Sequence, residues 1–423
     1  MKAVIHSERA RRISSVTGCL IVQLCVGIIY LWSIFKTPIA NSFGCSAADL
    51  NMVSSYMLTA FVVGCFLGGI LNDRHGPRST CLLGIQLFSA GMILSAALSP
   101  STIKLISFTY ACLGGLGSGL SYSACVSCVQ KWLPDKRGLA TGLAVSAFGL
   151  STVIFAPVSQ AIMGVFTDAA TCIVNFRGVF ATLALIFLAL GLIACQLIHL
   201  PEHQQAKTHA STSSSDLSIS QAVRTRQYWC IFFTVFFING TWNLTVPILY
   251  DLGIERGLSA TLATFAVSFT GIPNAFGRLL MATLSDKLGR RTCTCLLAAI
   301  TAVAALMMIL ARGWLFIAVV AVIAFAYGGP SSVNAAMTTD YFGSRHSGTN
   351  YGVMMLALGL SSLFFNALSS TLLKSSVTLS FLIAAVSALV PIFLMKLIGK
   401  APASASDLRY SKNNSSLRNI VSH

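Results

Sequence analysis

The chain has 423 residues, of which 55% are apolar and only 9% are charged, and its mean hydropathy is +0.78. Soluble globular proteins carry about 25% charged residues, so this composition excludes a soluble enzyme and a disordered chain. The net charge of +16 does not indicate nucleic acid binding, because the excess of Lys and Arg is typical of cytoplasmic loops between membrane spans. The composition predicts an all-α polytopic membrane protein.

Apolar segments follow one another along the whole chain. A bilayer core of about 30 Å requires roughly 20 apolar residues per helix. The first segment is too long for the core of a signal peptide and opens a series, so we expect no cleavage. Pro157, Pro247 and Pro273 lie inside segments and are expected to kink them. The twelve predicted spans are residues 13–37, 52–71, 80–98, 103–130, 139–163, 176–199, 227–250, 260–284, 292–310, 314–339, 349–371 and 377–398.

The distribution of basic residues predicts the orientation. If the N-terminus is cytoplasmic, the cytoplasmic side carries 21 Lys and Arg residues and the opposite side carries six. Cytoplasmic loops are enriched in these residues, so we expect both termini in the cytoplasm. Only Arg278 belongs to neither side, since it lies within a span.

Polar stretches divide the chain into two halves. Residues 200–226 are rich in Ser, Thr and Gln and are predicted to be a cytoplasmic linker between six-helix bundles at 1–199 and 227–398. Residues 399–423 are predicted to be a disordered cytoplasmic tail. Most of the 13 cysteines lie inside apolar runs, without the spacing of disulfides or zinc sites, and are interpreted as small buried side chains.

An internal repeat supports this division. The segments Gly69-Ile-Leu-Asn-Asp-Arg-His-Gly-Pro-Arg78 and Ala282-Thr-Leu-Ser-Asp-Lys-Leu-Gly-Arg-Arg291 share one pattern, and their aspartates lie 213 residues apart. Gly138, after the fourth span, has a counterpart 210 residues later, Gly348, after the tenth. Two landmarks with nearly the same offset indicate parallel repeats of six helices.

This loop pair on six plus six helices resembles the major facilitator superfamily over essentially the whole chain. The resemblance implies two bundles that rock about a midplane site, with the loop charges acting as a conformational latch at the cytoplasmic face. The predicted latch residues are Asp73, Arg74, Arg78, Asp286, Lys287, Arg290 and Arg291.

Shorter motifs resemble the oxalate–formate antiporter family, which is related to the monocarboxylate transporters. They are Tyr30-Leu-Trp-Ser33, Tyr122, the block Lys131-Trp-Leu-Pro-Asp-Lys-Arg-Gly138, and Asn350-Tyr-Gly352. The resemblance implies that Arg278 contacts the substrate carboxylate. It also places Tyr30, Trp32, Tyr122, Phe148 and Tyr327 in the wall of the substrate pocket.

Arg278 also stands out without the resemblance. It precedes Asp286 by eight residues and so lies about 12 Å deeper along a helix. A charge inside the bilayer costs at least about 2.5–3.5 kcal/mol, and the spans contain no Asp or Glu to pair with it. A guanidinium matches a carboxylate through two parallel N–H donors, which favours an anionic substrate.

Departures from the family pattern concern selectivity. Leu358 occupies the position of a lysine in the family's oxalate exporter, Ile29 that of a glutamine, and Ser331 that of a tyrosine. A dianion would therefore keep one uncompensated charge in a low-dielectric cavity. We expect a small monocarboxylate of the formate, lactate or pyruvate class rather than oxalate.

The coupling mechanism is predicted from Asn274, which lies one helical turn from Arg278 where monocarboxylate transporters have an aspartate. Asparagine cannot carry a proton, so we expect exchange. The alternatives are a proton-coupled symporter of the same substrates and a non-transporting sensor on the same scaffold. No enzyme activity is expected, because the spans hold no nucleophile–base pair.

The remaining expectations concern ligands and location. The chain has no Walker A or dinucleotide motif, and we expect no cofactor and no metal. The predicted partners are a small carboxylate and the lipid bilayer, without nucleic acid, and the predicted functional unit is a monomer. The predicted location is the cell membrane, as a multi-pass protein of a bacterial inner membrane.

Overall fold

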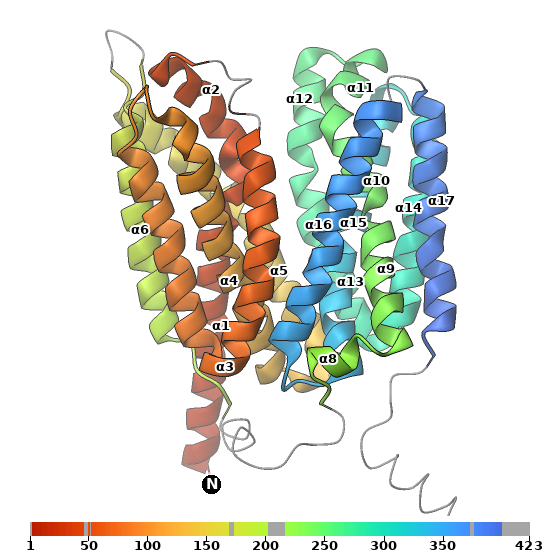
Figure 1. The fold of residues 1–423 in the computed structure, drawn as a ribbon. Helices are drawn as coiled ribbons and strands as arrows, with labels where there is room; N and C mark the ends of the chain where they lie inside the picture. Colours follow the sequence, from red (N-terminus) through yellow and green to blue (C-terminus); the bar gives the residue numbers. More distant parts are fainter. Residues whose placement is uncertain are drawn as a thin grey trace, which may run out of the picture.

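The computed structural model describes residues 2–45, 50, 52–168, 173–201, 216–372 and 376–399, and these residues are nearly all helical. The helices form two bundles that stand side by side, the N-terminal one coloured red to yellow and the C-terminal one green to blue (Figure 1). The N-terminus and the short helix α8 (Ile219–Ala222) lie at the same end of the molecule. This is the end that the basic residues predict to be cytoplasmic.

The N-terminal bundle contains the elements from the start of the chain to α6. Its elements are α1 (Lys2–Val26), η1 (Gly27–Leu31), α2 (Trp32–Phe43), α3 (Met52–Ala96), η3 (Ile103–Leu105), η4 (Ser107–Leu113), α4 (Gly114–Trp132), η5 (Pro134–Lys136), α5 (Arg137–Val165) and α6 (Phe176–Gln196).

The C-terminal bundle begins directly after α8. Its elements are α9 (Arg226–Ile238), α10 (Gly240–Thr245), η6 (Val246–Ile248), α11 (Leu249–Glu255), α12 (Ala260–Phe269), α13 (Gly271–Leu288), α14 (Arg290–Leu310), α15 (Gly313–Phe342), α16 (Ser347–Leu372) and α17 (Val377–Leu397). Residues 202–215 of the predicted linker and 400–423 of the predicted tail lie outside the described residues.

Eight helices in the described part of the chain are long and apolar enough to cross a membrane, and a bent pair adds a ninth. One of the eight, α3, is 45 residues long and bends at Gly76, whose φ of 82° favours glycine. Two predicted spans, 52–71 and 80–98, lie on either side of this bend. The number of twelve spans stays a prediction.

Several predicted spans are broken rather than straight. The bent pair turns by 52° between Thr245 and Leu249, where the 3₁₀ segment contains Pro247. The span predicted at 260–284 divides at Thr270, three residues before Pro273. A proline lacks the N–H that continues the helix ladder, so these breaks have a local cause in the sequence.

Large apolar side chains lie on the outside of both bundles. Leu310 is 81% exposed, Val165 80% and Trp314 72%. Polar side chains such as Gln23, Thr141 and Asn334 are instead buried between helices. Helix bundles with apolar side chains outside and polar side chains inside suit a lipid environment, in agreement with the hydropathy of the chain.

Candidate functional site

A cavity lies between the two bundles, about midway along the helices. The cavity offers about 30 Å³ to the centres of water molecules. On the same measure, one water requires roughly 10–15 Å³. The cavity therefore has room for a molecule of only a few heavy atoms. It is lined by Phe61, Tyr122, Phe148, Val235, Asn239, Arg278, Tyr327, Pro330, Ser331, Asn334, Tyr351, Met354, Met355 and Leu358.

Arg278 lies on α13 and is only 5% exposed. Its Nε donates to Asn274 Oδ1 at 2.7 Å, and its Nη1 donates to the carbonyl oxygen of Val145 on α5 at 3.3 Å. Both of these acceptors are neutral oxygens. Among the lining residues described, Arg278 is the only one that carries a charge.

Close helix packing fixes the position of Arg278. A Cβ atom on Gly277 would lie 2.1 Å from the carbonyl oxygen of Phe325, and one on Gly328 would lie 2.1 Å from that of Asn274. Glycines at these two positions therefore bring α13 and α15 into backbone contact. This contact places Arg278 beside the part of α15 from which Tyr327 and Ser331 face the cavity.

Aromatic rings form the wall that the N-terminal bundle contributes. The ring centroids of Tyr122 and Phe148 are 5.1 Å apart, and Phe61 lies 5.3 Å from Tyr122 and 5.5 Å from Phe148. On the opposite side, Tyr327 stacks on Trp242 at 4.9 Å. These rings give the cavity rigid apolar walls around the single guanidinium.

Two tyrosines connect the bundles at the cavity. The hydroxyl oxygens of Tyr122 on α4 and Tyr351 on α16 are 3.4 Å apart. The Tyr351 hydroxyl also donates to the carbonyl oxygen of Ser331 at 3.3 Å. Both tyrosines are nearly fully buried and line the cavity.

The structure gathers six of the ten predicted substrate residues around this cavity. They are Arg278, Tyr122, Phe148, Tyr327, Ser331 and Leu358. Asn274 lies behind Arg278 and orients it through the bond to Nε. Trp32 packs elsewhere, because its Nε1 donates to the carbonyl oxygen of Leu50 at 3.2 Å and its ring lies 5.2 Å from that of Tyr110.

Two predicted residues have no described side chain. Ile29 and Tyr30 belong to the 3₁₀ segment η1, whose backbone is described, but their side chains lie outside the described residues.

Sequence reasoning missed several cavity residues. Tyr351 belongs to the Asn-Tyr-Gly motif, and this motif is a signal from which its place in the cavity wall could be predicted. Asn334 follows Tyr327 and Ser331 at spacings of seven and three residues, so it shares their helix face. Phe61, Val235 and Met355 carry no such signal, because apolar residues occur on every face of their helices.

A second group of polar residues joins the bundles at the predicted cytoplasmic end. Asp286, at the end of α13, accepts hydrogen bonds from the backbone N–H groups of Gly138 and Leu139, both at 2.8 Å. These N–H groups belong to the first turn of α5. The N–H groups of a first turn have no acceptor within their own helix. A carboxylate at this position satisfies the free donors and the positive end of the helix dipole.

The internal repeat produces the same contact again. Asp73 on α3 accepts hydrogen bonds from the backbone N–H groups of Gly348 and Thr349 at the start of α16, at 3.3 and 2.8 Å. The Thr349 hydroxyl also donates to Asp73 at 2.7 Å. Each half of the chain therefore caps a helix of the other half.

Glycine permits both of these close approaches. A Cβ atom on Gly138 would lie 2.1 Å from the carbonyl oxygen of Ala282, and one on Gly69 would lie 2.1 Å from that of Gly348. Backbone oxygens cannot retreat as a flexible side chain can. The helix pairs α5–α13 and α3–α16 can therefore meet only where one helix lacks a side chain.

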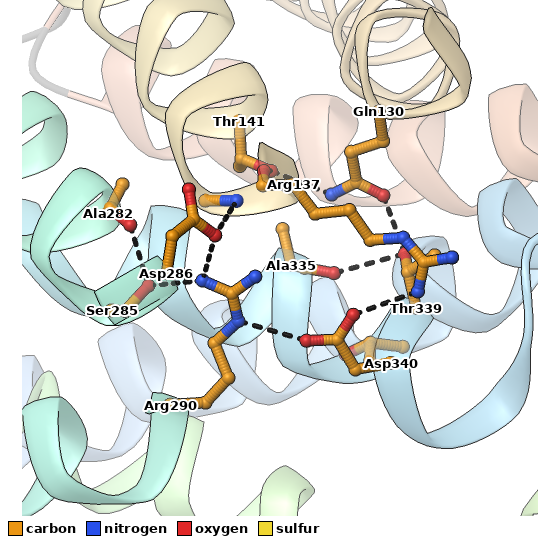
Figure 2. A network of polar contacts seen from close by, with 12 residues as sticks. Gln130, Arg137, Thr141, Ala282, Ser285, Asp286, Arg290, Ala335, Thr339 and Asp340 are labelled. Atoms are coloured by element: carbon orange, nitrogen blue, oxygen red, sulfur yellow. Dashed lines mark hydrogen bonds and ion pairs between the residues drawn. The ribbon is translucent and has the colours of Figure 1, made fainter. Parts of the chain in front are cut away.

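Charged residues strengthen only one of the two repeated contacts. Arg290 pairs with Asp286 at 2.6 Å and with Asp340 at 2.9 Å, and Arg137 of the N-terminal bundle reaches Asp340 at 2.8 Å (Figure 2). The Thr339 hydroxyl donates to Gln130 Oε1 at 2.6 Å beside this network. At the pseudo-equivalent site, the hydroxyls of Ser127 and Ser347 are 2.9 Å apart instead.

The other predicted latch residues do not join the bundles through their described contacts. Arg78 donates to Gln196, and Arg291 donates to the carbonyl oxygen of Met395 at 2.7 Å, each within its own bundle. Arg74 and Lys287 are exposed. Arg137 and Asp340, which are not among the predicted latch residues, form an ion pair between the halves.

The comparisons with known proteins agree with this architecture. The family model described as Major Facilitator Superfamily matches residues 17–255 and 231–422. The chain belongs to the major facilitator superfamily. It is a multi-pass membrane transporter with the all-helical fold of this superfamily.

Individual relatives refine the comparison. The chain is similar to the oxalate:formate antiporter of Oxalobacter formigenes, with 26% identity over 84% of this chain and 84% of that protein. It is also similar to monocarboxylate transporter 13 of Bos taurus, with 27% identity over 41% of this chain and 38% of that protein. A crystal structure of FucP in the outward conformation superimposes with a TM-score of 0.73 at 14% identity, covering 92% of this chain and 98% of that one.

Proposed function

We propose that this superfamily member exchanges small monocarboxylates across the cell membrane by alternating access. The observation that carries the proposal is the charge on the cavity wall: Arg278 is the only charged residue among the described residues that line the cavity. One buried guanidinium neutralises one carboxylate through paired N–H donors. A second carboxylate would stay uncompensated in the apolar enclosure.

The size of the cavity supports the same substrate class. A volume of about 30 Å³ for water centres corresponds to two or three waters. Formate, with three heavy atoms, matches this space, whereas lactate and pyruvate, with six each, require the side chains that line it to move outward. The aromatic wall and Leu358 would contact the apolar part of such a substrate.

The contacts at the cytoplasmic end supply the conformational step. The bonds of Asp73 and Asp286 to helix N-termini, and the ion pair of Arg137 with Asp340, join the bundles below the cavity. This geometry is a state closed toward the cytoplasm. Opening to the cytoplasm requires these bonds to break together, so we propose that these residues form the latch.

Exchange follows from the partners of Arg278. The side-chain amide of Asn274, which accepts from Arg278 Nε, cannot take up a proton. A carrier whose buried cation is neutralised by the substrate changes state more readily when loaded than when empty, which is the kinetic basis of exchange.

Uptake into proteoliposomes tests this function. Labelled formate, lactate, pyruvate and oxalate would be offered to vesicles that are empty or preloaded with the same anion. We expect uptake of a monocarboxylate, accelerated at least 10-fold by internal substrate and insensitive to a pH gradient. Uptake that is driven into empty vesicles by inward protons would instead establish a symporter, and transport of none of the monocarboxylates would contradict the proposal.

Adding a second cation to the cavity should change the selectivity between monocarboxylates and oxalate. In Leu358→Lys, an ammonium on α16 joins Arg278 in the same cavity, so a dianion is neutralised and a monoanion leaves one positive charge over. We expect oxalate exchange to rise about 10-fold or more and lactate exchange to fall by a similar factor. Leu358→Met, which conserves volume and neutrality, is the matched control and should keep the wild-type ratio. A folded Lys variant that still excludes oxalate would show that Leu358 does not set the charge selectivity.

A further inference from the structure

Asn334 is a buried polar residue of the cavity that the proposed function has not yet used. It lies on α15, is 2% exposed and lines the cavity. Its Oδ1 accepts no hydrogen bond from any described residue. Leaving a buried acceptor without a donor is unfavourable, so a native protein normally supplies a partner from a ligand or from water.

The other polar side chains of the cavity have partners within the protein. Asn239 Nδ2 donates to the carbonyl oxygen of Val235 at 2.6 Å, and Ser331 Oγ donates to that of Gly328 at 2.7 Å. Tyr351 is bonded to Tyr122 and to the backbone of α15. Among the described lining residues, Asn334 is the one with a fully buried polar atom for which the described residues provide no partner.

Asn334 and Arg278 lie at similar depths along their helices. Arg290 pairs with both Asp286 and Asp340, so these two aspartates mark one level at the cytoplasmic ends of α13 and α15. Arg278 precedes Asp286 by eight residues and Asn334 precedes Asp340 by six. At 1.5 Å per residue, they lie about 12 Å and 9 Å above this level, which is less than one helical turn apart.

We propose that Asn334 accepts a hydrogen bond from the hydroxyl group of a 2-hydroxy monocarboxylate whose carboxylate is bound by Arg278. In such an acid, the hydroxyl is attached to the carbon next to the carboxylate. The two groups are separated by a single carbon, so one small molecule can address two residues that line the same cavity. This inference rests on the proposed function and narrows its substrate class to acids such as glycolate and lactate.

Matched pairs of substrates test the proposal. Lactate and propionate have nearly the same size and charge, and they differ by the hydroxyl, as do glycolate and acetate. We expect wild-type exchange to favour the hydroxy acid of each pair by at least about 10-fold, because a site built around a hydroxyl rejects the analogue that lacks it. In Asn334→Leu, the preference should fall to within about twofold, through loss of lactate exchange and retention of propionate exchange.

Asn239→Leu is the control variant. Asn239 lines the same cavity, but its side-chain nitrogen Nδ2 already donates to the backbone carbonyl of Val235. It should keep the lactate-to-propionate ratio even where total exchange falls. If Asn334→Leu does not accumulate as a folded protein, Asn334→Ala is measured in its place, with the same expected loss of preference.

The outcomes separate this inference from the proposed function. Equal exchange of lactate and propionate by the wild type, or an unchanged preference in the Asn334 variants, would overturn the role of Asn334 and leave monocarboxylate exchange standing. Transport of no monocarboxylate by the wild type would overturn both. A hydroxyl preference that is lost only in the Asn334 variants supports the proposal.

Discussion

Replacing Arg278 by glutamine should reduce monocarboxylate exchange by at least about 30-fold. Arg278 is only 5% exposed, and its guanidinium donates to two neutral oxygens, those of Asn274 and of the Val145 backbone. Removing one partner of a buried, hydrogen-bonded charge pair costs about 2–5 kcal/mol, and each 1.4 kcal/mol is a factor of ten. Exchange of labelled lactate in preloaded proteoliposomes measures the effect.

Two controls distinguish loss of binding from loss of folding. Thermal unfolding of the purified variant should show a Tm close to that of the wild type, but without the rise that lactate gives the wild type. Arg278→Lys keeps the charge without the two parallel donors and should retain a small part of the activity. Full exchange by a folded Arg278→Gln protein would show that the arginine is structural, and the proposed site would be wrong.

Adding one methyl group at Gly138 should have the second largest effect. In Gly138→Ala, the backbone N–H that donates to Asp286 remains, but the new Cβ would lie 2.1 Å from the carbonyl oxygen of Ala282. Overpacking of this kind costs about 1–3 kcal/mol, and here the cost falls on the state closed toward the cytoplasm. We expect the population of that state to drop by a factor of about 5 to 150 and exchange to fall accordingly.

Gly164→Ala is the matched control, because Gly164 lies on the same helix and a Cβ there would have no neighbour within 4 Å. It should exchange at the wild-type rate. Spin labels carried by non-canonical amino acids at the exposed positions Lys136 and Lys287 report the distance between the bundles at this end. A longer distance in Gly138→Ala is expected, and an unchanged distance with normal exchange would contradict the role of the α5–α13 contact.

The two repeated contacts between the bundles differ in their side chains. The contact of α5 with α13 carries Arg137, Arg290 and Asp340, whereas that of α3 with α16 has serine hydroxyls at the corresponding place. Salt screens charged pairs near the surface more than it affects hydroxyl contacts. The repeat thus preserves the backbone geometry of both contacts while allowing their side-chain chemistry to differ.

The sequence by itself determined the membrane class, the superfamily resemblance and the importance of Arg278. Hydropathy and charge are properties of composition and of position along the chain, so they can be read without knowledge of the fold. The offsets of 213 and 210 residues likewise revealed the repeat before any contact between its halves was known. Arg278 stood out because a charge within an apolar span is costly wherever the helix lies.

The tertiary structure alone decided which faces of the helices meet. Trp32 packs beside Leu50, and Asn334 enters the cavity, because the faces of uniformly apolar helices carry little polar contrast from which their orientation could be predicted. The pairing of Arg137 with Asp340 joins residues 203 positions apart. Such contacts depend on backbone approach at Gly138 and on the relative placement of two bundles, which local sequence patterns do not encode.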